Sequence, residues 1–241
     1  MFDVIAWTPY CGPAPDPAEA LGRWNADPVL LSVLVAATVG GMLLMQRKDR
    51  GPFTAAMAVL AVGFVSPLCA VSSALFTART LHHLLLVLAA APLLALCLPR
   101  LKRPSLAAAT AVQAAVFWAW HAPGLYAQAL SHDGTYWLMQ VSILGSAVWF
   151  WAGVRSARGH AAVVALLAAM LLMGLLGALI VFAGQPVYAP HFASTMAWRM
   201  TPLEDQQAAG LIMWAPAAAA YLLVALWRIN GLLKPAGEAA A

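Results

Sequence analysis

Long apolar stretches separated by short polar breaks dominate the chain after its first 27 residues. A membrane-spanning helix needs about 20 mostly apolar residues, so each stretch can cross a bilayer upright or tilted, although two are short. Helices are expected, because an open sheet cannot pair its edges in lipid and no stretch alternates like a barrel strand. The expected spans are 28–45, 52–67, 77–98, 105–121, 135–154, 160–183 and 202–229.

Composition excludes most other classes of protein. Of the 241 residues, 63% are hydrophobic and 9% are charged, whereas a soluble domain has about 45–50% apolar and about 25% charged residues. A water-soluble globule, a disordered chain, a coiled coil and a secreted disulfide scaffold are therefore excluded. The expected fold is all-α, a polytopic seven-transmembrane-helix bundle over 28–230, with a Pro-rich segment 1–27 before it and a tail 231–241 after it.

Basic residues predict the orientation of this bundle, because cytoplasmic loops collect Lys and Arg. Three of them, Arg23, Arg79 and Arg199, fall on one side. The other side has Arg47, Lys48, Arg50, Arg100, Lys102, Arg103, Arg155, Arg158, Arg228 and Lys234. We therefore expect an exported N-terminal segment and a cytoplasmic C-terminus. The positive-inside tendency then explains the net charge of +4, and no nucleic-acid partner is expected.

The clearest helix start in the sequence is Thr201-Pro202-Leu203-Glu204, which is typical of a capping box with proline at the first helical position. Acidic side chains there complement the helix dipole, which explains Glu204. A cap does not require the longer polar run, which continues through Asp205 and Gln206. These two residues are therefore expected to face the outer mouth of the bundle and to contact either a site or a partner.

Histidines gather on the predicted outer side. His82 and His83 lie roughly 8 Å inside the outer end of the third span, at 1.5 Å per residue, and His121 closes the fourth span. An ionisable residue within a membrane span faces the bundle interior, either as a packing residue or as part of a site. Because three histidines share one level, we favour a site. Pro123 and Gly124 end the helix after His121, so His121 is expected to reach water.

Sulfur-containing residues extend this set. Cys11 lies in the exported segment, and Met213 shares a stripe of the last span with Gln206. A single methionine is more often an apolar packing residue, but imidazole, thiolate and thioether together suit copper(I). Three cysteines predict no disulfide framework. No CxxC, HExxH, GxGxxG or Walker pattern occurs, and no nucleophile is paired with a base, so no enzymatic activity is expected.

Three longer motifs point to a family. They are Ser66-Pro67-Leu68 followed by Leu81-His82-His83-Leu84, then Trp120-His121-Ala122-Pro123-Gly124, and Pro202-Leu203-Glu204-Asp205-Gln206-Gln207 running to Pro216. Over spans two to seven the chain resembles the CtaG family of multi-span cytochrome c oxidase assembly proteins. The resemblance implies a bacterial plasma (inner) membrane protein that assembles haem–copper oxidases and has a copper role. Arg79-Thr80 departs from the histidine-containing or apolar pair expected in relatives.

Three functions remain open. In the first, a non-enzymatic assembly factor holds copper (Cu+) at an outward-facing site and loads the oxidase catalytic subunit. His82, His83 and His121 would form that site with Met213 as a soft ligand, and Cys11, Asp205 and Gln206 would form a partner or secondary site. In the second, a redox protein binds haem through one histidine from each of spans three and four. A metal-free scaffold is the third. The expected partners are cytochrome c oxidase subunits, the lipid bilayer and periplasmic copper donors.

Overall fold

Helices form all the regular structure in the described part of the chain, as expected from the sequence. The computed structural model describes residues 7–101 and 105–233, and no strand occurs within these ranges. Lys102, Arg103 and Lys234, which contribute to the predicted charge asymmetry, lie outside the described residues.

The elements follow one another closely along the chain. They are η1 (Ala20–Gly22), α1 (Pro28–Leu44), α2 (Arg47–Phe64), α3 (Pro67–Ala74), α4 (Phe76–Leu85), η2 (Leu86–Ala90), α5 (Ala91–Cys97), α6 (Leu106–Trp120), α7 (Pro123–Ala129), α8 (Asp133–Ser156), α9 (Gly159–Val181), η3 (Ala189–His191), η4 (Thr195–Trp198), α10 (Pro202–Ile212), η5 (Met213–Ala217) and α11 (Ala218–Leu233). Two of them, η2 and η5, are π-helical turns inside longer helices.

Two helix starts follow directly from the sequence. The Thr201 side chain accepts from the Glu204 backbone N–H while Glu204 accepts from the Thr201 backbone N–H, so the capping box at the start of α10 is confirmed. At α1, the Asp27 carboxylate accepts from the Val29 and Leu30 backbone N–H groups, and Pro28 is the first helical residue. A predicted break is wrong at α2, which begins at Arg47 rather than Pro52. The polar run 48–52 forms the first turns of this helix instead of a loop.

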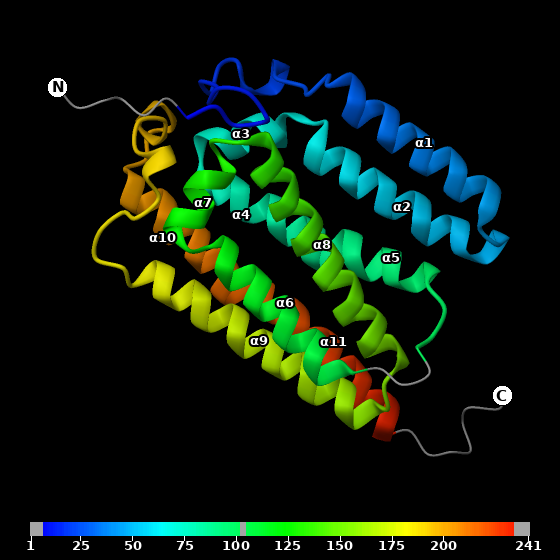
Figure 1. Ribbon diagram of the computed structural model, residues 1–241. Coiled ribbons are helices and arrows are strands. Elements are labelled where there is room, and N and C mark those ends of the chain that lie inside the picture. The colour runs from blue at the N-terminus through cyan, green and yellow to red at the C-terminus, as the bar shows by residue number, and fades with distance from the viewer. Residues whose placement is uncertain (1–6, 102–104, 234–241) are drawn as a thin grey trace.

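The helices lie side by side in an elongated bundle (Figure 1). α1 packs on α2 at one edge, α2 on α5, and α5 on α8. α8 then packs on α6, and α6 on α9, which pairs with α10 and α11 at the opposite edge. α4 lies against α10, so the first and last thirds of the chain meet inside the bundle.

The two ends of the bundle differ. At the loop-capped end, α3, α7, η3, η4 and the segment 7–27 cover the helix termini (Figure 1). The other end, which we call the arginine end, has the α1–α2 turn, the end of α5, the α8–α9 turn and the end of α11. Its described basic residues are Arg47, Lys48, Arg50, Arg100, Arg155, Arg158 and Arg228. The charge therefore separates along the bundle axis, while the orientation in a membrane stays a prediction.

Four helices are long and apolar enough to cross a membrane, namely Phe76–Cys97, Asp133–Ser156, Gly159–Val181 and Pro202–Leu233. Arg47–Phe64 together with Pro67–Ala74 forms a fifth candidate, bent by 44° at its break. Pro28–Leu44 and Leu106–Trp120 are shorter apolar helices. Each expected span thus corresponds to a helix or to helices in line, but seven crossings remain a prediction.

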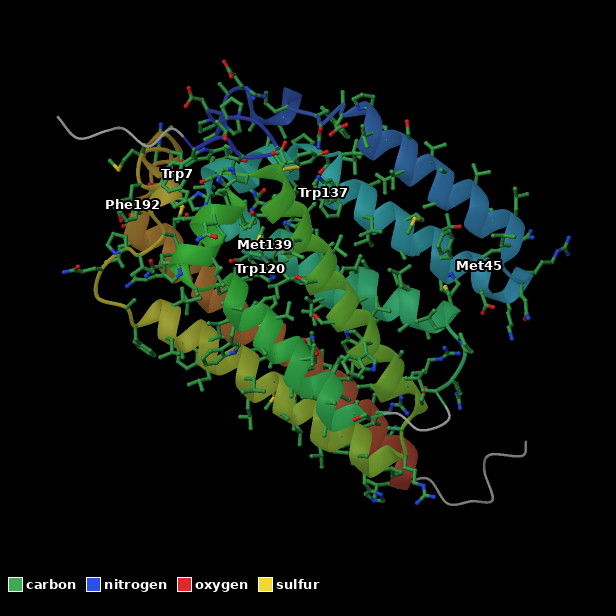
Figure 2. The ribbon with its side chains drawn as sticks, in the orientation of Figure 1. Trp7, Met45, Trp120, Trp137, Met139 and Phe192 are labelled. Atoms are coloured by element: carbon green, nitrogen blue, oxygen red, sulfur yellow. A yellow bond between two sulfur atoms is a disulfide. The ribbon has the colours of Figure 1, made fainter. Side chains whose placement is uncertain are left out.

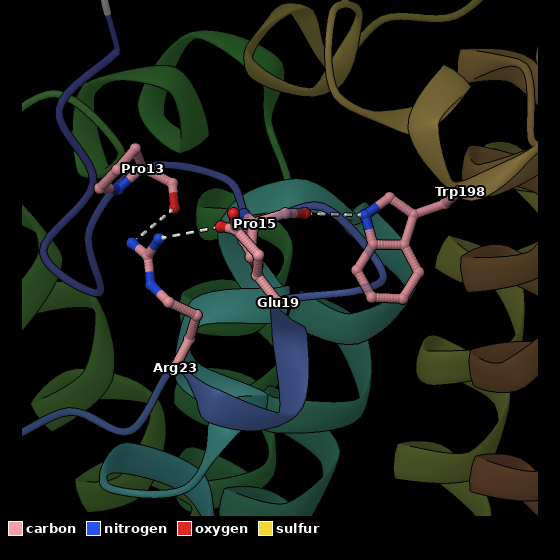
Figure 3. Close-up of polar contacts among 5 residues, drawn as sticks. All are labelled: Pro13, Pro15, Glu19, Arg23 and Trp198. Atoms are coloured by element: carbon pink, nitrogen blue, oxygen red, sulfur yellow. Dashed lines mark hydrogen bonds and ion pairs between the residues drawn. The ribbon is translucent and has the colours of Figure 1, made fainter.

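The N-terminal segment is folded against the loop-capped end. Trp198 Nε1 donates to the Pro15 carbonyl over 3.1 Å, and Arg23 Nη2 donates to the Pro13 carbonyl over 3.4 Å (Figure 3). Arg23 also pairs with Glu19 at 3.9 Å (Figure 3). In Figure 2, the labelled Trp7 and Phe192 lie at this end and Met45 lies at the other.

A disulfide joins this segment to the bundle, which the sequence did not predict. Cys11 and Cys69 are 58 residues apart in the chain, and their Cα atoms lie 5.3 Å apart across the bond. A single bond is not a disulfide framework, but the pairing itself was missed, because it depends on the segment folding back over the start of α3. Cys97 is the free cysteine of the described residues.

Candidate functional site

Three histidine rings form a row inside the bundle near the loop-capped end. His83 lies in the middle, with its ring centroid 6.1 Å from that of His82 and 5.6 Å from that of His121. His82 and His83 are on α4, and His121 is the C-cap residue of α6. The structure therefore brings together the three histidines singled out in the sequence.

The backbone of α6 orients the His121 ring. His121 Nδ1 lies 2.7 Å from the Phe117 carbonyl oxygen, one turn earlier on the same helix. A carbonyl can only accept, so Nδ1 has the proton and Nε2 keeps its lone pair. Nε2 is buried and has no hydrogen-bond partner among the described residues. A ring nitrogen fixed by a backbone carbonyl, with the other nitrogen free, is typical of metal-ligating histidine.

His82 and His83 have different surroundings. The His82 ring packs edge-on against Phe64, with centroids 4.8 Å apart. It also lies against Gly63 of α2, where an added Cβ would be 3.0 Å from His82 Nε2. A glycine at this position therefore allows α2 and α4 to approach. His83 turns toward α6, so it is the α4 histidine that pairs with His121.

The expectation that His121 reaches water is wrong, whereas His82 and His83 face the bundle interior as expected. His82 and His83 are 0% exposed and His121 is 3% exposed. The loop 182–201 explains this burial, because Tyr188 from that loop donates its hydroxyl to the His121 carbonyl oxygen at 2.9 Å. Tyr188 also stacks on Phe76, with ring centroids 3.7 Å apart. The site thus lies under a layer of loop and aromatic rings.

Asp205 contacts the helix that has the histidines. Its carboxylate accepts from the Phe76 backbone N–H at 2.6 Å and from the Thr77 backbone N–H at 3.0 Å. The Thr77 hydroxyl donates to the Asp205 carbonyl oxygen at 2.8 Å. Asp205 is fully buried. It therefore caps α4 from the neighbouring α10 and does not point into a mouth of the bundle.

Gln206 holds the loop that covers the site. Its Oε1 accepts from the Val187 backbone N–H at 2.8 Å, and its Nε2 donates to the Ile180 and Gln185 carbonyl oxygens at 3.3 Å each. It is 1% exposed, so the expected outward-facing position is wrong for Gln206 as well. Its side chain fixes the turn after α9 instead.

Met213 lies at the tight contact of α9 with the last helix. A Cβ at Gly177 would be 3.1 Å from Met213 Cβ and 2.7 Å from the Gly210 carbonyl oxygen. Met213 is 0% exposed and begins η5, which also packs against α4.

Cys11 is not available as a thiolate ligand while its disulfide with Cys69 is formed. Its sulfur lies 3.5 Å from the Tyr136 hydroxyl, which places the disulfide beside the interior of the bundle. The interpretation of Cys11 as a free soft ligand therefore changes to that of a covalent link.

Arg79 is a member of the site that the sequence marked only as a departure from relatives. It lies three and four residues before His82 and His83, so the three share one side of α4. The guanidinium is 0% exposed, and none of its nitrogens has a hydrogen-bond partner among the described residues. Its Cζ lies 5.3 Å from the Tyr136 ring centroid. A cation buried within an otherwise apolar span was the signal that could have identified it.

His191 also escaped prediction, because it lies in a loop. Its Nε2 is 2.6 Å from the Tyr126 hydroxyl, and the residue is 2% exposed. Burial, and then the nearby positive charge of Arg79, lower the pKa of His191 from 6.5 to about 3. His191 is therefore neutral at physiological pH.

These side chains do not form a metal cage of the usual kind. In 7–101 and 105–233, no group of three or more His, Cys, Asp or Glu side chains is arranged to hold a metal ion. What the described residues provide is a pair of adjacent imidazoles, at His83 and His121, with ring planes 80° apart, beside a guanidinium without a hydrogen-bond partner.

Comparison with protein-family models identifies the family of this chain. Residues 46–234 match the model of the cytochrome c oxidase caa3 assembly factor (Caa3_CtaG). The chain belongs to this family. The Caa3_CtaG match includes His82, His83, His121, Asp205 and Met213, and it begins after α1. The resemblance over spans two to seven is thereby confirmed, and the family role implies association with cytochrome c oxidase. Searches of curated proteins and of solved structures found no significant match.

Proposed function

We propose that this Caa3_CtaG protein is a non-enzymatic assembly factor of the bacterial plasma membrane that holds copper(I) between His83 and His121. It passes the ion to the catalytic subunit of cytochrome c oxidase. Membership of the family supports the assembly role. The observation that best supports the copper role is the Nδ1 contact of His121 with Phe117, which leaves a buried Nε2 free.

The spacing of the rings fits one ion. A metal ion lies about 2 Å from an imidazole nitrogen. Ring centroids 5.6 Å apart therefore leave room for one ion between His83 and His121. Imidazole and thioether both suit copper(I). Met213 is the candidate thioether, because η5 packs against the helix of His83.

The cover over the site suggests how copper would be exchanged. Tyr188 and Gln206 hold the loop 182–201 across His121 and the end of α9. Loading and release would require this loop to move. The charge asymmetry of the sequence supports a position of the loop outside the cytoplasm, where periplasmic copper donors and oxidase subunits could reach it.

Haem is the weaker alternative. An axial ligand needs an open plane for the porphyrin, but the Phe117 ring centroid lies 4.4 Å and the Phe76 centroid 6.1 Å from that of His121. These rings fill the space beside the imidazole. A metal-free scaffold does not explain why the nitrogens of His83 and His121 are buried without hydrogen-bond partners.

Copper(I) titration of the purified protein against a chelator tests the proposal. His83→Ala and His121→Ala should each lose stoichiometric copper, since each removes one of two adjacent ligands. His82→Ala is the matched control on the same helix, and the exposed His160→Ala is the control at the arginine end. An optical spectrum without a Soret band excludes haem. Wild-type copper stoichiometry in a His82, His83 and His121 triple alanine variant would disprove the copper site and leave a scaffold.

A further inference from the structure

A second candidate site lies at the arginine end, away from the histidines. A groove of about 510 Å³ runs between α5, α8 and α11, which is within the usual range for ligand sites. Its lining includes the apolar Leu88, Leu93 and Trp151. Arg100, Arg155 and Arg228 also line it. None of the described lining residues is acidic.

Two of the three arginines are held in place without being neutralised. Arg155 Nη1 donates to the Ala95 and Leu98 carbonyl oxygens at 2.8 and 2.6 Å, and Arg228 Nη2 donates to the Val154 carbonyl oxygen at 2.8 Å. These acceptors are uncharged. In the part of the chain that the structure describes, Arg23 and Glu19 form the one ion pair. Arg228 Nε is buried without a partner.

The groove extends along most of one leaflet of a bilayer. Leu88 and Leu96 both line it and are eight residues apart, which is roughly 12 Å along a helix at 1.5 Å per residue. Half of a hydrocarbon core about 30 Å thick is about 15 Å. Trp227, whose ring centroid lies 5.7 Å from Arg228 Cζ, also lines the groove. Tryptophan at this level is typical of the membrane–water interface.

We propose that this groove binds an anionic phospholipid, with its phosphate on Arg100, Arg155 and Arg228 and an acyl chain along Leu88, Leu93 and Trp151. Basic pockets between membrane helices bind such head groups. The positive-inside tendency explains basic loops, but it does not require three arginines to converge on an apolar groove. The lipid would hold α5, α8 and α11 together where no direct ion pair links them.

Native mass spectrometry of the protein from nanodiscs tests this proposal with two matched double variants. Arg100→Gln/Arg228→Gln removes two groove charges, and Arg47→Gln/Arg158→Gln removes two charges from the same end outside the groove. Phosphatidylglycerol retained by the groove variant should fall at least roughly tenfold, since each arginine is worth about 1 kcal/mol toward an anionic surface. The control variant and wild type should retain it equally.

A third variant keeps the test decisive if the groove variant folds poorly. Ala89→Phe fills the apolar part of the groove and leaves the arginines in place, and it should also lose the lipid. The proposal would be overturned if all variants retained as much phosphatidylglycerol as the wild type. It would also be overturned if the wild type retained phosphatidylcholine as well as it retains phosphatidylglycerol. Displacement of the lipid by millimolar inorganic phosphate would identify a simple anion site and would also overturn it.

Discussion

The Asp205 carboxylate caps a helix to which it does not belong. Its Oδ2 accepts from the Phe76 backbone N–H at 2.6 Å, across 129 positions of sequence. Leu75, the N-cap residue of α4, provides no side-chain hydrogen bond of its own. The first turn of the helix with His82 and His83 is therefore fixed by α10, so the two ends of the family domain are coupled at the site.

Removing this cap should destabilise the protein. Asp205→Ala leaves the buried Phe76 and Thr77 N–H groups without acceptors, which costs about 1–3 kcal/mol. Unfolding of the purified protein in detergent measures the loss, and the amount of assembled oxidase in cells should fall with it. Asp205→Asn keeps one oxygen acceptor, so its stability should lie between those of the wild type and of Asp205→Ala. Gln207→Ala lies in the same polar run and serves as the control. An unchanged midpoint for Asp205→Ala would contradict the capping role.

Replacing Arg79 should have the opposite effect on stability. A cation–π contact such as the one with Tyr136 contributes about 2 kcal/mol when desolvated, whereas burying an unpaired cation costs several kcal/mol. Arg79→Met should therefore raise the free energy of unfolding by about 1–3 kcal/mol. Thermal unfolding of the purified protein measures this gain. A less stable Arg79→Met protein would show that Arg79 is paired.

Breaking the Cys11–Cys69 disulfide should release the N-terminal segment. A cross-link that closes a loop of 58 residues contributes about 2–4 kcal/mol. Cys11→Ser should lower thermal stability and make the segment 7–27 sensitive to protease, as should a reductant on the wild type. Cys97→Ser, at the free cysteine, is the control. A segment that stays protected after reduction would mean that Trp198 and Arg23 hold it without the disulfide.

His191 should make the protein sensitive to acid. Its pKa is lowered from 6.5 to about 3 in the folded state, so the unfolded chain takes up the proton first as pH falls. The stabilising effect of the neutral ring is complete above pH 6.5 and is lost progressively toward pH 3. Between these values, His191→Gln should reduce the slope of unfolding free energy against pH by about 1.4 kcal/mol per unit. An unchanged slope for His191→Gln would contradict this role.

The long helices could be predicted from sequence because lipid imposes one simple rule on them. Apolar runs of sufficient length give helices, and proline, glycine and charged residues mark their ends. The bounds of α8 and α9 agree with expectation within two residues. α3 and α7 were missed, because each lies beside a longer helix and, at eight and seven residues, is too short to form an apolar run of spanning length.

The site could be predicted only in part. His82, His83 and His121 were identifiable because an imidazole inside a membrane span needs an explanation. The burial of His121 was not, since it depends on Tyr188, which reaches His121 across 67 positions of sequence. The same holds for the disulfide and for the cap from Asp205. Contacts of this kind follow from tertiary packing, which hydrophobic pattern alone does not specify.

The π-helical turns η2 and η5 have a consequence for which side chains their helices present. Each widens its helix locally, so the side chains after it are rotated relative to an uninterrupted α-helix. η2 begins three residues after His83, and η5 begins at Met213. The half of each helix beyond its π-helical turn therefore presents a different set of side chains to its neighbours and to lipid than a continuous α-helix of the same sequence would present.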